Sequence, residues 1–231
     1  MQIHVNWDSQ VLAKFPKLSI RIGIINSVNV EKENKQIQKL RKAVYAEVRA
    51  KYNIETLKDN PKVRIYRDFY WSLNIDPTKT RPSGEALLRR VLHGDELPRI
   101  STVVDAYNLA SMKTIIPISG FDKDRLSPPF QIRFARNGEA FTGIGMSKPL
   151  TLTDKMLVLA DERQVLCIYP YRDSDYTKIT KQTRNVLMVG YGAPGITENQ
   201  LSEAVETTLS YIKIASNGET KMIKIFNSAS K

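Results

Sequence analysis

The sequence predicts an α+β fold in one compact unit. Amphipathic segments with helical spacing occur in the first, middle and last parts of the chain, and short apolar runs of strand length lie between them. With 231 residues, of which 42% are hydrophobic and 26% charged, the chain can bury one sizeable core. Because neither an internal repeat nor a convincing linker divides it, we expect residues 1–231 to form a single domain.

The N-terminal part, residues 18–52, has the pattern of a strand followed by a basic helix. Ile20, Ile22 and Ile24 alternate at period two, which is typical of a half-buried strand. Gly23 inside this run predicts either a bulge or a close approach of another backbone. From residue 31 to residue 52 the apolar side chains then follow the spacing of a helix.

The remaining faces of this first helix are rich in lysine and arginine. Two interpretations are open, an ordinary solvated face or a stripe that contacts phosphates. The whole chain has 35 Lys and Arg against 24 Asp and Glu, a formal net charge of +11. Such an excess attracts polyanions such as RNA, but basic proteins without a nucleic-acid partner are also common. The candidate RNA-contacting residues are Lys35, Lys39, Arg41, Lys42, Arg89 and Arg90.

Two helices are expected in the middle of the chain. The first spans about 82–93, where an apolar stripe is followed by Gly94 at the position that favours a left-handed residue. The second spans about 101–113, with Ser101 as its N-cap. Between them and the C-terminal part, residues 130–189 are expected to form strands separated by turns.

The C-terminal helix is the clearest element of the sequence. Thr197 and Gln200 match a capping box, in which each side chain satisfies a backbone N–H at the start of the helix. Apolar residues then follow one helical face over residues 197–213. Asn217 and Gly218 end this helix, and a short strand is expected around residues 222–225.

The composition excludes several classes of protein. A single cysteine, Cys167, cannot form an internal disulfide, and with only His4 and His93 beside it a zinc site is not expected. No apolar run approaches the roughly 18 residues of a membrane-spanning helix, and the N-terminus lacks a signal-peptide pattern. We therefore expect a cytoplasmic protein with no metal, no cofactor and no membrane association.

Three polar groups are candidates for chemistry, each with a structural alternative. Asn108 can donate and accept hydrogen bonds to a substrate, or can bond only to neighbouring backbone. The segment 116–121, with Ser119 and Gly120, is expected as a loop whose N–H groups converge on an oxyanion, or as an ordinary turn. The guanidinium of Arg172 can bind a carboxylate or phosphate, or can pair with a neighbouring aspartate.

An ordered set of motifs resembles the B3/B4 domain, which edits mischarged tRNA in the β subunit of bacterial phenylalanyl-tRNA synthetase. The matches run from about residue 67 to residue 189. They are LLRR at 87–90, VVDAYN at 103–108, PISGFDKDRL at 117–126, IRFA at 132–135 followed by GE at 138–139, and YRDS at 171–174 with Thr183. The resemblance implies a B3/B4-like fold with a β-rich core of mixed sheets flanked by helices.

The sequence departs from the family pattern at three pocket positions. Tyr107 stands where the synthetase domain has Thr, Ser119 where it has His and Val189 where it has Glu, while Asn108 is kept. The imidazole and the carboxylate of the family pocket are therefore missing, and the larger Tyr107 implies a smaller or different amino acid. The resemblance gives Asn108, Ser119 and Gly120 as candidate catalytic residues. It gives Tyr107, Arg133, Arg172, Asp173, Ser174, Thr183 and Val189 as candidate pocket residues.

The resemblance implies a stand-alone editing protein that hydrolyses the ester of a mischarged aminoacyl-tRNA in trans. Its partners would be the aminoacylated 3′ end of tRNA and an aminoacyl-tRNA synthetase. Two alternatives stay open, a non-catalytic tRNA- or RNA-binding module and a small-molecule-binding protein on the same fold. Fold alone does not decide between them.

Overall fold

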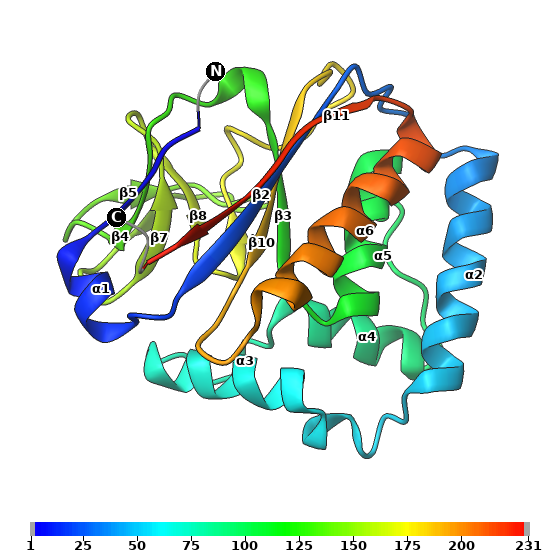
Figure 1. Ribbon diagram of the computed structural model, residues 1–231, viewed down its shortest axis with the longest axis horizontal. Coiled ribbons are helices and arrows are strands. Elements are labelled where there is room, and N and C mark those ends of the chain that lie inside the picture. The colour runs from blue at the N-terminus through cyan, green and yellow to red at the C-terminus, as the bar shows by residue number, and fades with distance from the viewer. Residues whose placement is uncertain (1–2, 229–231) are drawn as a thin grey trace.

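The computed structural model describes residues 3–228 and has an α+β architecture, as the sequence predicts. Three layers are visible in Figure 1: a group of helices on one side, a four-stranded sheet in the middle and a second group of strands on the other side. The first sheet has the strand order β11-β2-β10-β3 and is antiparallel throughout. The second has the order β1-β4-β7-β8-β9, and β5 and β6 form a separate pair.

The strands are β1 (Val5–Trp7), β2 (Ser19–Asn26), β3 (Ile118–Asp122), β4 (Phe130–Phe134), β5 (Ala140–Phe141), β6 (Leu150–Thr151), β7 (Leu157–Ala160), β8 (Val165–Ile168), β9 (Arg172–Asp173), β10 (Val186–Tyr191) and β11 (Glu219–Asn227). The helices are α1 (Ser9–Lys14), α2 (Lys35–Lys51), α3 (Pro61–Ser72), α4 (Ser83–Leu92), α5 (Thr102–Thr114) and α6 (Glu198–Ser216), with short 3-10 helices at Leu57–Asp59 and Lys123–Arg125.

The expected helices form close to their predicted bounds, and α2, α5 and α6 each have a side-chain N-cap, whereas α4 follows Pro82 without one. Asn34 accepts a hydrogen bond from the Ile37 N–H and delays the start of α2 to Lys35, four residues later than expected. Ser101 caps α5 in the same way. At α6 both halves of the capping box form between Thr197 and Gln200.

Glycines allow α6 to lie directly on the four-stranded sheet. A Cβ added to Gly23 of β2 would stand 2.8 Å from Val205 Cγ1 and 2.9 Å from Leu209 Cδ1 of α6. A Cβ on Gly190 of β10 would stand 2.8 Å from Val205 Cγ2. The predicted close approach at Gly23 is therefore present. Because side chains alternate along a strand, Ile20, Ile22 and Ile24 lie on the opposite face of β2, where they are buried as well.

That opposite face meets the five-stranded sheet. Tyr191 of β10 is in register with Ile20 of β2 and shares its face. The Tyr191 ring packs against the ring of Tyr169, which follows β8, at 4.7 Å between centroids. The Tyr169 hydroxyl donates to the Gly192 carbonyl at 2.8 Å. The four-stranded sheet is thus buried on both faces, between the helices and the second sheet.

The structure corrects the expected loop at residues 116–121. Most of it is strand β3, which pairs with β10 from Ile118 to Asp122 and is buried along its whole length. Apolar Ile118 and Phe121 flank Ser119 and Gly120, and the two small residues in succession indicated a turn that sheet pairing overrides. The other elements outside the expectations are β1, α1, the 3-10 turn before α3, α3 itself and the 3-10 helix Lys123–Arg125.

Replacing Gly23 by valine should destabilise the fold, because the added atoms would overlap Val205 and Leu209 of α6. We expect a loss of about 1–3 kcal/mol in the free energy of unfolding, the range of overpacked cores. Thr220→Val, on the exposed part of β11, is the control and should change stability by less than about 0.5 kcal/mol. Urea unfolding measures both, and equal stability of the two variants would contradict the packing argument.

Candidate active site

The candidate site centres on a hydrogen bond between Ser119 and Asp173. The Ser119 hydroxyl on β3 donates to Oδ1 of Asp173 on β9, with 2.5 Å between the oxygens. Asp173 is held opposite Cys167 by the pairing of β8 with β9, and Ser119 is held opposite Val189 by the pairing of β3 with β10. The two sheets therefore meet at this pair, and the bond joins residues 54 positions apart in sequence.

Asp173 has an unusual ionisation for an aspartate. Burial raises the pKa of its carboxyl from 3.8 to about 6, although hydrogen bonds from Ser119 and Cys167 and the charge of Arg172 favour the ionised form. Burial likewise raises the pKa of the neighbouring Tyr107 phenol and of the Cys167 thiol, and the negative charge of Asp173 acts in the same direction. Asp173 is thus the group in this cluster that changes protonation near neutral pH, the range a general base needs.

Gly120 lies on the opposite face of β3 from Ser119 and contacts the helical layer. A Cβ there would stand 2.9 Å from Ile179 Cδ1, 3.0 Å from Tyr107 Cε1 and 3.1 Å from Met188 Sδ. The ring of Tyr107, which is 8% exposed, therefore fills the space beside Gly120. The substitution of Thr by Tyr noted in the sequence reduces the room on this side of β3.

The backbone N–H of Gly120 points to the free edge of the sheet. The Tyr191 N–H of β10 donates to the Pro117 carbonyl, just before β3, so residue 117 bonds toward β10. The Asp122 N–H of β3 donates in the opposite direction, away from β10, to the Thr177 carbonyl. Because N–H directions alternate along a strand, the Gly120 N–H, two residues before Asp122, faces the same outer edge. The structure thus gives one outward donor at this position, where the sequence predicted a loop of converging donors.

Asn108 is half-buried on α5, one residue after Tyr107. Successive helical residues are rotated by about 100°, so Asn108 starts from a different side of α5 than Tyr107, which faces β3. Around the helix axis, Asn108 is only about 60° from Asp105. The Asp105 carboxylate accepts a hydrogen bond from Arg41 of α2 at 2.7 Å. The helix therefore brings Tyr107, rather than Asn108, directly against β3.

Three other predicted pocket residues lie on β9 or after it, and each contacts a different neighbour. Arg172 is exposed, and its side chain lies over Gly143, where a Cβ would be 2.8 Å from Cγ and Cδ of the arginine. Ser174 is buried, and its hydroxyl accepts a hydrogen bond from the Tyr176 N–H. Thr183 is buried and donates to Asp122 at 2.7 Å. Arg172 is therefore the exposed cation of this group.

Arg133 does not join the other predicted pocket residues. It lies on β4, separated from β9 by β7 and β8 in the strand order. Both of its terminal nitrogens donate to the Glu139 carboxylate, at 2.9 and 2.7 Å. The two residues line a separate polar hollow of about 450 Å³ with Arg136 and Arg163. The IRFA and GE motifs thus form an internal ion pair away from Ser119.

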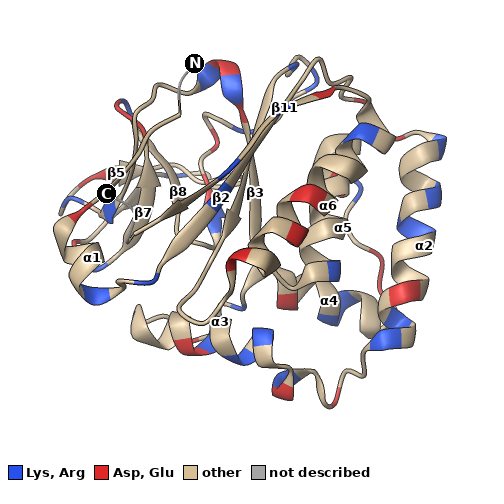
Figure 2. Cartoon of the chain, viewed as in Figure 1, with Lys and Arg blue, Asp and Glu red and all other residues tan. Residues whose placement is uncertain are grey.

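The candidate RNA-contacting residues divide into internal and exposed groups. Arg41 is buried and binds both Glu33 and Asp105, at 2.9 and 2.7 Å, so it holds the helices together and the prediction that it contacts RNA is corrected. Arg89 is bound by the buried Glu85, which Arg67 also contacts. The exposed members are Lys35, Lys39, Lys42 and Arg90. Figure 2 shows blue segments along α2, on the outer side of the helical group.

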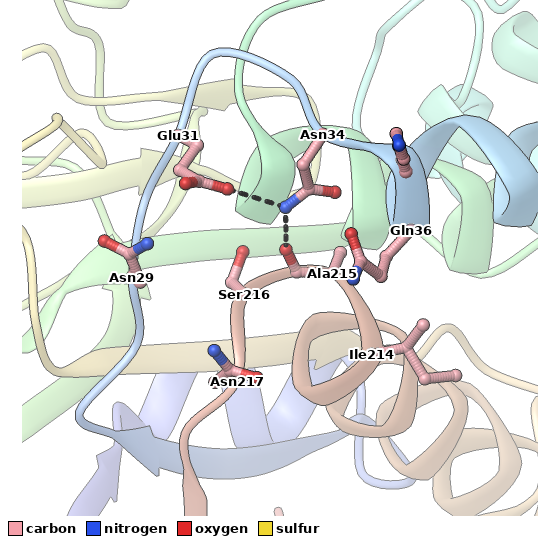
Figure 3. A pocket seen from close by; sticks show the side chains of 9 residues that line it. Asn29, Glu31, Asn34, Gln36, Ile214, Ala215, Ser216 and Asn217 are labelled. Carbon is pink, nitrogen blue, oxygen red and sulfur yellow. Dashed lines mark hydrogen bonds between the residues drawn. The ribbon is translucent and has the colours of Figure 1, made fainter.

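The largest hollow described in the structure lies elsewhere. It has a volume of about 460 Å³ and is formed where the start of α2 meets the end of α6, with Asn29, Glu31 and Asn34 on one side and Ser216 and Asn217 on the other (Figure 3). The Asn34 amide bridges the two sides by donating to Glu31 and to the Ala215 carbonyl. Of the candidate site residues, it includes Lys35.

Sequence reasoning missed the partnership at the centre of the site. Ser119 and Asp173 were both named as candidates, but no local pattern connects a residue on β3 to one on β9. Cys167 and Tyr191, which surround the pair, looked like ordinary apolar strand residues. Within residues 3–228, no helix is long and apolar enough to cross a membrane, and no group of three or more His, Cys, Asp or Glu is placed to hold a metal ion.

The fold and the site define an α+β domain in which a polar pair joins two sheets beneath a helical layer. Residues 65–213 match the family model described as the B3/4 domain, a wider range than the motifs alone indicated. This match includes α5, β3, β9 and β10, the elements that hold the site. The chain belongs to the B3/4 domain family.

Curated relatives are β subunits of phenylalanine–tRNA ligases. The Neisseria meningitidis serogroup B protein is 28% identical over 115 residues, which are 50% of this chain and 14% of that protein. The Yersinia pestis protein is 30% identical over 101 residues, 44% of this chain and 13% of that protein. The matched region is thus a small part of each relative's length.

A solved structure shares the fold. An N-terminal fragment of the phenylalanyl-tRNA synthetase β subunit from Pyrococcus horikoshii superposes with a TM-score of 0.51 over 95% of this chain and 50% of that chain. Its sequence identity of 13% makes it a likeness of fold alone. It confirms the predicted B3/B4-like fold.

The raised pKa of Asp173 predicts how stability depends on pH. The folded protein binds the Asp173 proton more tightly than the unfolded chain, so the stabilisation present below about pH 4 is lost as pH rises to about 6. Asp173→Asn removes this ionisation. The variant should therefore match the wild type at pH 4 and exceed its unfolding free energy by roughly 1–3 kcal/mol at pH 7.

Urea unfolding at pH 4, 5, 6 and 7 measures this difference. Asp175→Asn is the matched control, because Asp175 is close in sequence but forms an accessible ion pair with Lys178. A stability difference between wild type and Asp173→Asn that does not change with pH would show that Asp173 ionises normally.

Proposed function

We propose that this protein hydrolyses the ester of a mischarged aminoacyl-tRNA in trans. The single observation that supports this best is the hydrogen bond between Ser119 and the Asp173 carboxylate, whose pKa is about 6. The family pattern has His and Glu at the positions of Ser119 and Val189, and both groups are missing from this sequence. Asp173 supplies a carboxylate to Ser119 from the other sheet.

In the proposed reaction Asp173 is the general base. Its carboxylate takes a proton from a water molecule, and the water oxygen forms a bond to the ester carbonyl carbon. The negative charge moves to the carbonyl oxygen, where the outward N–H of Gly120 stabilises it. The intermediate then expels the terminal ribose oxygen, which takes the proton back from Asp173. Ser119 orients the carboxylate, and Asn108 is proposed to bind the substrate.

The packing around Tyr107 supports a small substrate side chain. Tyr107, Ile179 and Met188 already fill the volume beside Gly120, within about 3 Å of a hypothetical Cβ. An amino acid with a bulky side chain would have to displace one of them. A pocket that admits only smaller side chains would complete the double sieve of an editing system. We therefore propose that the amino acid removed is smaller than phenylalanine or tyrosine.

The basic surface supports tRNA as the carrier of that ester. The net charge of +11 attracts a polyanion over long range, and exposed Lys35, Lys39 and Lys42 are spaced to lie along one side of α2. Such contacts raise affinity without reading sequence. We propose that the protein acts in the cytoplasm on a tRNA charged by a separate synthetase.

The first test is deacylation of a panel of purified mischarged aminoacyl-tRNAs by the wild type and by single-residue variants. One or two species should be hydrolysed, at a rate that rises with pH through about 6 as Asp173 loses its proton. Asp173→Asn should reduce the rate about 100-fold or more, Ser119→Ala and Asn108→Ala should reduce it as well, and Asp175→Asn should leave it unchanged. Full activity of Asp173→Asn would exclude it as the base.

A second candidate is a non-catalytic tRNA-binding module. The observation that favours it is the burial of the site, since Ser119 is 4% exposed and Tyr107 is hardly more. On this reading the protein would bind tRNA without hydrolysing any of the panel.

Both candidates require electrostatic binding of tRNA. The affinity should fall steeply between 50 and 200 mM salt, on the order of tenfold or more, because bound counterions are released from the phosphates. Lys39→Gln with Lys42→Gln should weaken binding and reduce this salt dependence, whereas Arg41→Gln should instead destabilise the fold. Filter binding or anisotropy at several salt concentrations measures it, and a flat salt response would remove the argument from charge.

A further inference from the structure

Tyr176 is the most exposed large hydrophobic side chain described in the structure. Its exposed fraction is 66%, compared with 54% for Trp71 and 50% or less for the others. It lies three residues after Asp173, between the buried residues Ser174 and Thr177. The core therefore does not use this ring, although its neighbours on both sides are buried.

The backbone that carries Tyr176 is held in place on every side. The Asp175 N–H donates to the Thr142 carbonyl at 2.9 Å, and the Tyr176 N–H donates to the Ser174 hydroxyl at 3.3 Å. The Tyr176 carbonyl accepts from the Arg125 guanidinium at 3.1 Å. The next carbonyl, of Thr177, accepts from the Asp122 N–H of β3. The ring is thus presented on a fixed support, which lowers the entropy cost of binding anything against it.

The surroundings of the ring are positively charged. The segment 172–184 contains Arg172, Lys178, Lys181 and Arg184 against Asp173 and Asp175. Lys178 is paired with Asp175. Arg184 donates to the carbonyls of Lys181 and Thr183, and because carbonyls are neutral these bonds do not compensate its charge. Arg125, beside Tyr176, is half exposed and lies 3.8 Å from Asp122. An exposed aromatic ring among cations attracts a ligand with both a flat π surface and negative charge.

We propose that Tyr176 is a platform on which an unpaired nucleobase at the 3′ end of the RNA substrate stacks. This inference rests on the proposed function and names how the RNA end is held at the same site. Arg125, which donates to the Tyr176 carbonyl, lies beside the platform and neutralises a flanking phosphate. Stacking on an aromatic side chain with cations along the backbone is the general mode of single-strand binding. The stacked terminal nucleotide places its ribose ester near Asp173, three residues away.

The chemistry of the patch favours single-stranded RNA over a protein partner. A protein interface of useful affinity needs a contiguous apolar core, whereas the groups placed beside Tyr176 are charged, namely Asp175, Lys178 and Arg125. A paired base could not reach the ring because its faces are already stacked within the duplex. An unpaired terminal base offers a free face and a phosphate on the same residue.

The test measures binding of uncharged tRNA to the full-length protein by anisotropy. Tyr176→Ala should weaken binding about 10- to 100-fold, while Tyr176→Phe, which keeps the ring, should stay within about twofold of the wild type. Trp71→Ala is the control, because Trp71 is an exposed aromatic residue on α3, and it should bind as the wild type does. With tRNA shortened by its unpaired 3′ nucleotides, wild type and Tyr176→Ala should bind equally.

Two results would overturn the platform. One is wild-type affinity of Tyr176→Ala for intact tRNA, and the other is an equal loss of affinity for intact and shortened tRNA. Hydrolysis of the mischarged panel is measured in parallel to separate this proposal from the enzymatic one. If hydrolysis depends on Asp173 but Tyr176→Ala binds tRNA as the wild type does, the platform is wrong and the enzymatic proposal stands. Ring-dependent binding without any hydrolysis would support the platform and sink the enzymatic proposal.

Discussion

The contact of α6 with the middle strands of the four-stranded sheet sets the spacing of the helical layer. Gly23 and Gly190 place no side chain between strand and helix, so Val205 lies where either Cβ would project. α5 packs along α6 and carries Tyr107 to within about 3 Å of Gly120 on β3. A side chain at position 23 or 190 would therefore move α6 outward, and α5 and Tyr107 with it. The position of Tyr107 beside Gly120 therefore depends on two glycines of other strands.

Strand β3 links this helical layer to the chemistry. Its successive side chains face opposite layers, Gly120 toward Tyr107 and Ser119 toward Asp173. Ser119 is in register with Val189 of β10, the position that the resemblance aligns with a glutamate of the family pattern. A carboxylate at position 189 would be a cross-strand neighbour of residue 119. Asp173 delivers a carboxylate to the same side chain from β9, so the charge is kept near this position while its source changes.

The sequence predicts local features well and long-range contacts poorly. Helix α6 follows from Thr197 and Gln200 because a capping box acts within one turn. Ser119 and Asp173 are both candidates from the sequence, but the bond between them depends on how two sheets pack, which no periodicity encodes. The same limit explains Arg41, whose helical position resembles that of the exposed lysines until Asp105 of α5 is brought beside it. It also explains Arg133, whose partner Glu139 is determined by the turn after β4.

For the proposed RNA substrate, the exposed cations form two separate areas. Arg41 and Arg89 are neutralised inside the helical layer, so they add to the net charge without offering a phosphate contact. The exposed lysines of α2 lie on the outer side of that layer, with α5 and α6 between them and β3 (Figure 1). A second set of exposed cations, Arg172, Lys181 and Arg184, belongs to the segment 172–184 that also contains Asp173. A short oligonucleotide could touch only one of these areas, whereas a folded tRNA is large enough to reach both. In the proposed function, long-range attraction by α2 and local placement of the 3′ end are therefore separable roles of two different areas.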